Sequence, residues 1–429
     1  MSKFSQQRVL ILGSNVGSAE IVKYARLNDA YTIVADNLPP EQSRAKLVSD
    51  DSVLISTADI DSLISFVARE NITNVMSGIS EFNLTQSIEI AKACGMPFYC
   101  TRAQWDSVGR KDQFRKQCEK FKVPCPKTWF VGNDTLGELS SIVYPVVIKP
   151  VDASASVGVR ICKNEIELLD AEIVARNQSK SGAIIVESFF SGTEFTAHYT
   201  ISGGRARLSM IDDRHGISIH EGTVTTIPVA RVYPSTCLTD YLEQVDPAMI
   251  ALSESLGVTN AVMFIQGIHD KTTGNFTIFE GGLRPAAEAT WRLVNHINGI
   301  NPLHHLVDQC ILGNSNYELS REDPRLGGAI GSVVSLAGRS GNIGKIVGVE
   351  RVLDEVSSIF DWESRYSVGS FVPDSDSLRQ IMIRFFMHNA SACDLVSDIE
   401  FINRYVHVFN ESGEEISLHF NPQELHFRF

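Results

Sequence analysis

The segment from Phe264 to Arg284 constrains the fold more than any other, because it combines a strand pattern with acid and amide side chains. Apolar and polar residues alternate on both sides of Asp270–Gly274, which is rich in turn-forming residues, so the pattern predicts a β-hairpin. A hairpin would bring Gln266 and Glu280 together, and their side-chain oxygens are ligands that Mg²⁺ prefers. The segment is therefore a candidate metal site, although a solvated surface hairpin would show the same pattern.

Length and composition indicate a folded protein of several domains. The chain has 429 residues, of which 43% are hydrophobic and 21% charged, and this length suits about two to four domains. The formal net charge is −13. A surface this acidic repels nucleic acid and anionic membrane, so neither is expected as a partner.

The cysteines and the apolar segments favour a cytoplasmic protein. None of the eight cysteines forms a C-x-x-C pair, which argues against a zinc ribbon or a thioredoxin motif. Scattered single cysteines suit a reducing compartment. The N-terminal residues are polar, unlike a signal sequence, and no apolar run is long enough to cross a bilayer.

The order of expected elements predicts a mixed α/β and α+β protein. Residues 1–105 alternate strands with helices, which is typical of a Rossmann-like parallel sheet, with Pro97–Tyr99 as its last strand. Residues 106–325 mix helices with hairpins. Residues 326–429 are strand-rich, with one expected helix at Ser377–Ala390.

The first βα unit also permits a rival function. The loop Gly13–Gly17 follows a strand and opens a helix, and Asp36 ends the next strand, which is the outline of a dinucleotide site. The usual third glycine is absent. An NAD(P)-dependent oxidoreductase is therefore an alternative to be tested.

A second group of residues has the chemistry of a phosphate site. Lys149 ends an apolar strand, where its ammonium can reach an anion, and the loop Ser154–Gly158 can form a nest of backbone N–H groups. A later apolar strand ends at Glu187, and Glu194 follows it. Taken singly, each of these is equally compatible with an ordinary loop or a surface acid.

Together with a helix that opens at Lys111, these pieces occur in an order that resembles the ATP-grasp superfamily. The spacing is most similar to the carbamoyl-phosphate synthetase and biotin carboxylase branch and to bacterial L-amino acid ligases. The resemblance covers about residues 1–320. It implies a pre-ATP-grasp domain (1–105), an ATP-grasp domain with two α+β subdomains around the nucleotide (106–325, with the lid subdomain at about 140–200) and a strand-rich cap (326–429).

The resemblance also implies a role for each candidate residue. Mg²⁺, or Mn²⁺ in its place, would be held by Gln266 and Glu280. Arg284 and Lys149 would be catalytic, and Arg284 would contact the substrate together with Glu81, which follows a sheet strand. ATP would be bound by Lys111, Lys149, Ser154, Ser156, Gly158, Glu187 (at the adenine edge), Glu194 (at the ribose) and His220.

One position departs from the family pattern. The family has Glu-x-Asn-x-Arg, in which Asn is a ligand of a second metal ion. Here Gly282 stands in place of this Asn, between Glu280 and Arg284. The second Mg²⁺ site is therefore in doubt, with Glu288 as a candidate replacement ligand.

The function that the resemblance implies is ligation of a small carboxylate, such as an amino acid, to an amine. The carboxylate would be activated as an acylphosphate by ATP, with release of ADP and phosphate. The partners would be small molecules, and a homodimer is the expected default. The alternatives are an enzyme of the biotin carboxylase or carbamoyl-phosphate type, the oxidoreductase, and a nucleotide-binding protein without catalysis.

Overall fold

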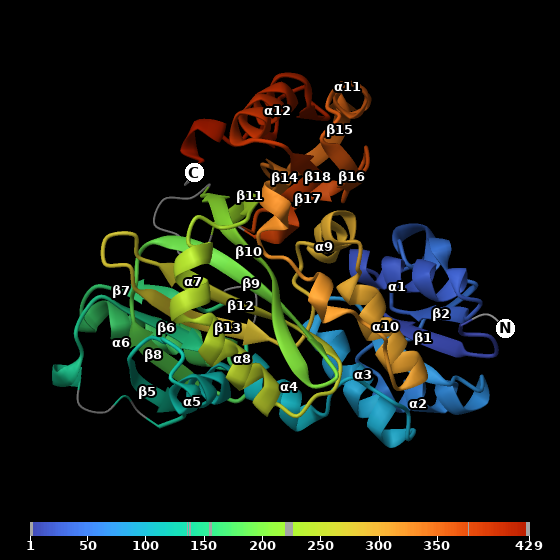
Figure 1. Cartoon of the computed structure of the whole chain (residues 1–429), viewed down its shortest axis with the longest axis horizontal. Helices are drawn as coiled ribbons and strands as arrows, with labels where there is room; N and C mark the ends of the chain where they lie inside the picture. The colour runs from blue at the N-terminus through green and yellow to red at the C-terminus, as the bar shows by residue number, and fades with distance from the viewer. Residues whose placement is uncertain are drawn as a thin grey trace.

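The computed structural model describes residues 3–134, 136, 139–153, 157–218, 226–375 and 377–425. These residues form four sheets. In Figure 1 the N-terminal sheet (blue) lies at one end, a small sheet (teal) at the other, and the C-terminal segment (orange to red) above the large sheet between them. None of the helices formed by the described residues is long and apolar enough to span a membrane.

The N-terminal sheet is parallel and has the strand order β3-β2-β1-β4, as the alternation predicts. The expected strand at Pro97–Tyr99 is wrong, because Tyr99 leaves this sheet and donates from its hydroxyl to the Leu283 carbonyl at 2.9 Å. The elements are β1 (Arg8–Leu12), α1 (Val16–Leu27), β2 (Tyr31–Ala35), β3 (Asp51–Val53), α2 (Ile60–Arg69), β4 (Asn74–Ser77) and α3 (Glu81–Ala93).

The small sheet is antiparallel, with the order β5-β8-β6-β7. Its apolar side packs on one helix, α6, through Leu168, Ala171 and Ala175. Two helices connect it to the N-terminal sheet, and the second begins at Lys111 as predicted. The elements are α4 (Arg102–Gly109), α5 (Lys111–Phe121), β5 (Thr128–Gly132), β6 (Val146–Pro150), β7 (Arg160–Cys162), α6 (Glu165–Gln178) and β8 (Ile184–Ser188).

The large sheet runs in the order β13-β12-β9-β10-β11-β14-β18-β16, so strands from the C-terminal segment extend it without a break. The predicted hairpin forms at Asp270–Gly274, and a second hairpin turns at Gly203–Gly204. The elements up to residue 312 are β9 (Thr193–Ser202), β10 (Arg205–Ile217), β11 (Ile227–Tyr233), α7 (Leu238–Gln244), α8 (Asp246–Ser255), β12 (Ala261–His269), β13 (Phe276–Gly282), α9 (Trp291–Asn298) and α10 (Pro302–Leu312).

In the C-terminal segment the expected helix at Ser377–Ala390 is wrong, because Ile381–Asn389 is the strand β18. It lies between β14 and β16 and is buried on both faces, so it lacks the alternation that identifies a half-exposed strand. The remaining elements are β14 (Ile330–Gly338), β15 (Gly341–Val347), α11 (Val349–Glu355), β16 (Ile359–Ser364), β17 (Phe371–Val372), α12 (Ala392–Tyr405), β19 (His407–Asn410) and β20 (Ser417–Leu418).

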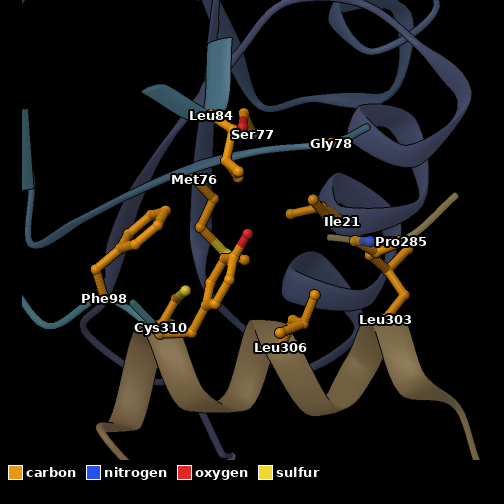
Figure 2. A pocket seen from close by; sticks show the side chains of 11 residues that line it. Ile21, Met76, Ser77, Gly78, Leu84, Phe98, Pro285, Leu303, Leu306 and Cys310 are labelled. Carbon is orange, nitrogen blue, oxygen red and sulfur yellow. The ribbon is translucent and has the colours of Figure 1, made fainter. Parts of the chain in front are cut away.

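The N-terminal sheet is joined to the rest of the molecule through α10. Figure 2 shows Met76 and Leu84 on one side of this contact and Leu306 and Cys310 of α10 on the other. The cavity between them has a volume of about 10 Å³, which is room for one water molecule. This tight packing fixes the start of α3 relative to the end of β13.

Candidate active site

The two candidate metal ligands lie directly opposite each other on the hairpin of β12 and β13. Gln266 pairs with Glu280 in the ladder, and opposed residues of an antiparallel pair project to the same face. Both side chains are half-buried, and neither forms a hydrogen bond or ion pair with any residue that the structure describes. Two converging oxygens without partners fit a hard cation.

A buried ion network lies beside this hairpin. Lys149, in β6, places its Nζ 2.6 Å from Glu187 Oε2, and Arg115 Nε lies 2.5 Å from Glu187 Oε1. The Arg115 guanidinium also donates to the carbonyls of Ile278 and Phe279, at 3.0 Å each. Arg115 therefore connects the small sheet to β13, immediately before Glu280 in the sequence.

The charges of this network are unbalanced. Burial lowers the pKa of Lys149. Burial alone would raise the pKa of Glu187, but the adjacent Lys149 and Arg115 outweigh it and lower that pKa. Lys111, whose Nζ donates to the Ala153 carbonyl at 2.7 Å, lies close enough to repel Lys149. Two cations thus contact one carboxylate and a third lies near Lys149, which leaves an excess positive charge suited to a polyanion.

The network engages the Glu187 carboxylate, and the expected place of this residue at the adenine edge stays a prediction. The family resemblance implies a place at the adenine edge, but the Glu187 side chain is only 1% exposed and is held by two cations. Sequence reasoning missed Arg115 altogether. Arg115 follows Lys111 by four residues on α5, so the two share a helix face, and this spacing was the available signal.

Glu194 lies on the same sheet face as Gln266. It stands two residues before Thr196 on β9, and Thr196 pairs directly with Gln266. The Glu194 carboxylate forms an ion pair with Arg214 at 2.7 Å. A ribose bound there would have to share this carboxylate with Arg214.

Arg284 and Glu81, the two candidate substrate residues, form an ion pair at 2.7 Å although they are 203 positions apart. Glu81 opens α3, and Arg284 follows β13. The Arg284 guanidinium also lies 4.7 Å from the centre of the Phe264 ring. Its Nε is buried and has no hydrogen-bond partner among the described residues, so one strong donor is left unsatisfied within the fold.

Comparison with known proteins agrees with this geometry. Residues 142–288 match the ATP-grasp domain family. The chain contains an ATP-grasp domain. Over 189 residues the chain is 25% identical to formate-dependent phosphoribosylglycinamide formyltransferase of Francisella tularensis. The matched segment covers 43% of this chain and 48% of that protein. The chain thus spans about half the length of this curated relative.

Two solved structures show that the ATP-grasp fold extends over nearly the whole chain. L-amino acid ligase from Bacillus licheniformis has a TM-score of 0.76 at 16% identity, covering 95% of this chain and 99% of that one. The biotin carboxylase domain of Hydrogenobacter thermophilus 2-oxoglutarate carboxylase, solved with MgADP and bicarbonate, has a TM-score of 0.74 at 14% identity. The match covers 96% of this chain and 91% of that structure's chain.

The departure from the ATP-grasp pattern at Gly282 has a steric cause. Gly282 lies directly opposite Phe264, and a Cβ at this position would overlap the Phe264 ring. The ring therefore fills the space that an Asn side chain would need. Glu288 does not replace that ligand, because its carboxylate is buried and bonded to Arg231 at 2.7 Å.

The dinucleotide alternative conflicts with the N-terminal sheet of this ATP-grasp protein. The Asp36 carboxylate, which would have to bind a ribose, forms a buried ion pair with Lys46 at 2.9 Å and accepts from Ser43. At the glycine loop, the Asn83 side chain lies against Gly13, so that a Cβ there would overlap it. The groups that a dinucleotide would need are already occupied.

The remaining candidates belong to loops. Ser154, Ser156 and His220 lie outside the described residues. Gly158 has a φ of +74°, and a Cβ there would lie 2.9 Å from the Pro150 ring, so only glycine fits beside β6.

Proposed function

We propose that this protein is an ATP-dependent ligase that joins a small carboxylate, such as an amino acid, to an amine, with release of ADP and phosphate. The observation that carries the proposal is the position of Arg115. It connects the Lys149–Glu187 pair of the small sheet to the strand that bears Glu280. Groups that suit phosphates and groups that suit a cation therefore meet at one place between two sheets.

Gln266 and Glu280 are the residues that would hold Mg²⁺. They fit this ion because both offer oxygen and neither is engaged by a described residue. When bound, Mg²⁺ would neutralise charge on the phosphates. Phe264 and Gly282 leave no room for a further side-chain ligand on this part of the hairpin, so we propose one metal ion held by protein side chains.

The cations supply the electrostatic part of the mechanism. Lys111, Lys149 and Arg115 outnumber Glu187 and would hold the triphosphate by charge and by hydrogen bonds. Because these groups are held in place before ATP binds, they need little reorganisation during phosphoryl transfer.

Arg284 would bind the carboxylate that is phosphorylated. Its free Nε faces no acceptor among the described residues, and Glu81 holds the other end of the guanidinium. A guanidinium fixed in this way suits a planar carboxylate. The carboxylate oxygen takes the phosphoryl group from ATP, and an amine then displaces phosphate from the acylphosphate, which forms an amide.

The substrate pair is identified by a screen for ADP release. Amino acids, formate and bicarbonate are tested as carboxylates, singly and with amines that include amino acids, and the products are analysed by mass spectrometry. The expected product has the summed mass of the two substrates minus one water. ADP release with bicarbonate alone would indicate the carboxylase-type alternative.

Two variants of the same hairpin control the screen. Glu280→Gln should abolish ADP release, whereas Lys271→Gln, an exposed residue of the hairpin turn, should leave it unchanged. ATP binding without ADP release from any substrate pair would support a non-catalytic nucleotide-binding protein instead.

A further inference from the structure

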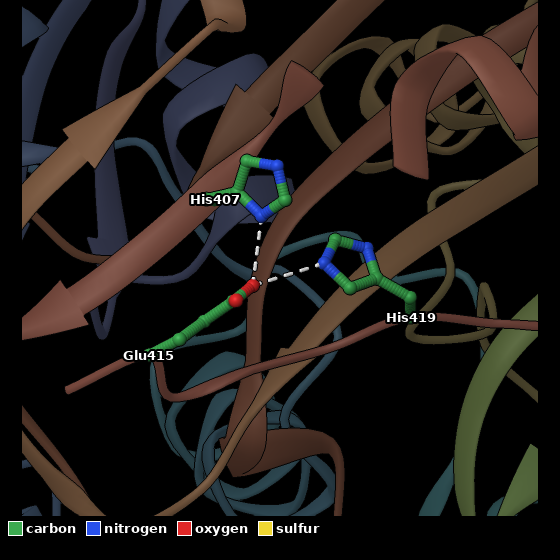
Figure 3. Close-up of side chains that lie close together, drawn as sticks. All are labelled: His407, Glu415 and His419. Atoms are coloured by element: carbon green, nitrogen blue, oxygen red, sulfur yellow. Dashed lines mark hydrogen bonds and ion pairs between the residues drawn. The ribbon is translucent and has the colours of Figure 1, made fainter. Parts of the chain in front are cut away.

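The C-terminal hairpin brings together two histidines and a glutamate (Figure 3). His407 lies in β19, Glu415 forms a bridge with Phe409 across the turn, and His419 follows β20. Residues two apart on a strand share a face, and so do residues that pair directly. Alternation from Glu415 to His419 on one strand, and from Phe409 to His407 on the other, therefore places all three side chains on one face.

The ligand atoms of these residues, His407 Nδ1, His419 Nε2 and a Glu415 oxygen, converge on a small volume. They all lie within 4.8 Å of one another, and no other three His, Cys, Asp or Glu residues do so within the described part of the chain. The three side chains remain 25–40% exposed, so an ion can reach them from solvent.

The turn holds the two strands in this register. The Asn410 side chain accepts from the backbone N–H groups of Ser412 at 3.0 Å and Glu414 at 2.9 Å. Gly413 has a φ of +80°, which favours glycine. The cluster is therefore built on a fixed hairpin rather than on a loop end.

The contacts of His407 define how its ring is oriented. Its Nε2 lies 3.1 Å from the Arg404 carbonyl, which can only accept, so this nitrogen carries the proton. Its Nδ1 lies 2.8 Å from Glu415 Oε1, which is also an acceptor. In the neutral imidazole the Nδ1 lone pair faces the carboxylate, so either a bound cation or a second ring proton lies between the two atoms. A backbone carbonyl on the far nitrogen is the usual support of a metal-bound histidine.

The spacing of the ligand atoms is close to that of a tetrahedral site. Bonds of about 2.0–2.1 Å to a Zn²⁺ ion separate neighbouring ligand atoms by roughly 3.3 Å. Here the two histidine nitrogens lie 2.8 Å and 3.2 Å from the Glu415 oxygen. The two nitrogens lie within 4.8 Å of each other, so a rearrangement of these partly exposed side chains would admit the ion.

The geometry points to a binding site for a divalent first-row transition metal, Zn²⁺ above all, held by His407 Nδ1, His419 Nε2 and a Glu415 oxygen, with water as the fourth ligand. Two imidazoles and one carboxylate suit Zn²⁺, Co²⁺ or Ni²⁺ better than Mg²⁺, which prefers oxygen alone. The bound ion ties β19 to the residue after β20. The site is independent of the proposed ligase activity and lies on different strands from Gln266 and Glu280.

The site is tested by metal binding to the full chain after treatment with a chelator. Zn²⁺ is titrated by calorimetry without ATP, and the d–d absorption of bound Co²⁺ reports the coordination geometry. We expect one tightly bound Zn²⁺ and a higher unfolding temperature with Zn²⁺ than without it. His419→Gln and His407→Gln should each weaken binding by at least about 100-fold, since even outer-shell changes cost roughly 10–100-fold.

Two further variants show whether the ion binds at this cluster or elsewhere on the chain. Glu414→Gln removes a carboxylate of this turn that lies outside the cluster. This variant should bind Zn²⁺ as the wild type does. Glu280→Gln should also keep the site, which excludes binding at the hairpin of β12 and β13. If the wild type binds no Zn²⁺, or binds it equally well after both histidines are replaced, the cluster is only an imidazolium–carboxylate pair and the proposal is wrong.

Discussion

Two buried arginines, Arg115 and Arg231, have opposite charge environments. Arg115 shares the single carboxylate of Glu187 with Lys149. Arg231 contacts two carboxylates, Asp212 and Glu288, each at 2.7 Å. The first cluster therefore has an excess of positive charge, whereas the charge of Arg231 is matched by carboxylates.

The difference separates a ligand site from a structural site. Buried charge is costly unless it is paired, so an unbalanced buried cluster is stabilised by a counter-ion from outside. The Arg115 cluster has the charge that the proposed phosphate site requires. The Arg231 cluster needs no further anion, and its ion pair engages the Glu288 carboxylate.

The largest expected effect is on stability when Glu187 loses its charge. Glu187→Gln leaves Lys149 and Arg115 without their shared carboxylate and should lower the free energy of unfolding by about 3–5 kcal/mol. Asp212→Asn should cost less, because Arg231 keeps Glu288. Denaturant unfolding of both variants measures the difference. A non-hydrolysable ATP analogue should restore stability to Glu187→Gln only, and equal losses without rescue would contradict the comparison.

The next effect is on catalysis. Lys149→Ala removes one cation but leaves Glu187 paired with Arg115, so the fold should persist while ATP-dependent phosphate release falls by about 10²–10³-fold. Arg351→Ala removes an exposed cation of α11 and, as the matched control, should retain most activity. Near-normal turnover by Lys149→Ala would show that the Arg115 cluster does not bind the phosphates of ATP.

A smaller effect is expected at the glycine beside the metal ligands. Gly282→Asn forces a side chain against the Phe264 ring and should lower the free energy of unfolding by about 1–3 kcal/mol. Adding Phe264→Ala should relieve this overlap. The number of Mn²⁺ ions bound in the presence of an ATP analogue then shows whether Gly282 and Phe264 exclude a second metal, since only the double variant should gain one.

The smallest effect concerns acid stability near Arg231. Burial lowers the pKa of His198 to about 4 from 6.5, so below pH 6.5 the unfolded chain takes up a proton that the folded chain does not. Stability should therefore fall by up to about 1.4 kcal/mol per pH unit from this group. His304 and His305 have the same lowered pKa of about 4, again because of burial. His296 also has a pKa lowered by burial, so His198→Gln should remove only part of the histidine-dependent slope, measured by urea unfolding.

Glu288 extends this acid sensitivity to lower pH. Burial would raise its pKa, but Arg231, Arg384 and His198 outweigh burial and lower it to about 2. The stability that this carboxylate contributes is present above its unfolded pKa of 4.5 and is lost as the pH falls toward 2. The loss of stability below pH 4.5 that Glu288 causes should remain in His198→Gln. An unchanged slope in that variant would show that His198 is protonated in the folded protein.

Local patterns predicted the parts of the fold in which alternation or a turn signal is written into the sequence. The hairpin of Gln266 and Glu280 alternates and has a turn signal, and the helix start at Lys111 is confirmed as well. The prediction of a helix over the strand Ile381–Asn389 is wrong, because burial on both faces removes the period. The site required long-range contacts that spacing cannot supply, above all the pairing of Glu81 with a residue 203 positions away.

Some missed features did have a signal. The register that pairs Gln266 with Glu280 also sets Phe264 opposite Gly282, so the overlap at that glycine followed from the hairpin itself. Likewise, the alternation from Glu415 to His419 indicated a shared face. What the alternation could not indicate was the position of His407 on the neighbouring strand, which depends on the turn geometry.

The unbroken large sheet has a consequence for dissecting the protein. β11 is bonded on one side to β10 and on the other to β14, which belongs to the C-terminal segment. Cutting the chain after residue 325 would remove this partner from Ala230–Tyr233 and expose unpaired backbone N–H and C=O groups along a buried strand, the kind of edge at which chains aggregate. The C-terminal segment thus covers the edge of β11, and a shortened protein should be insoluble rather than merely less specific.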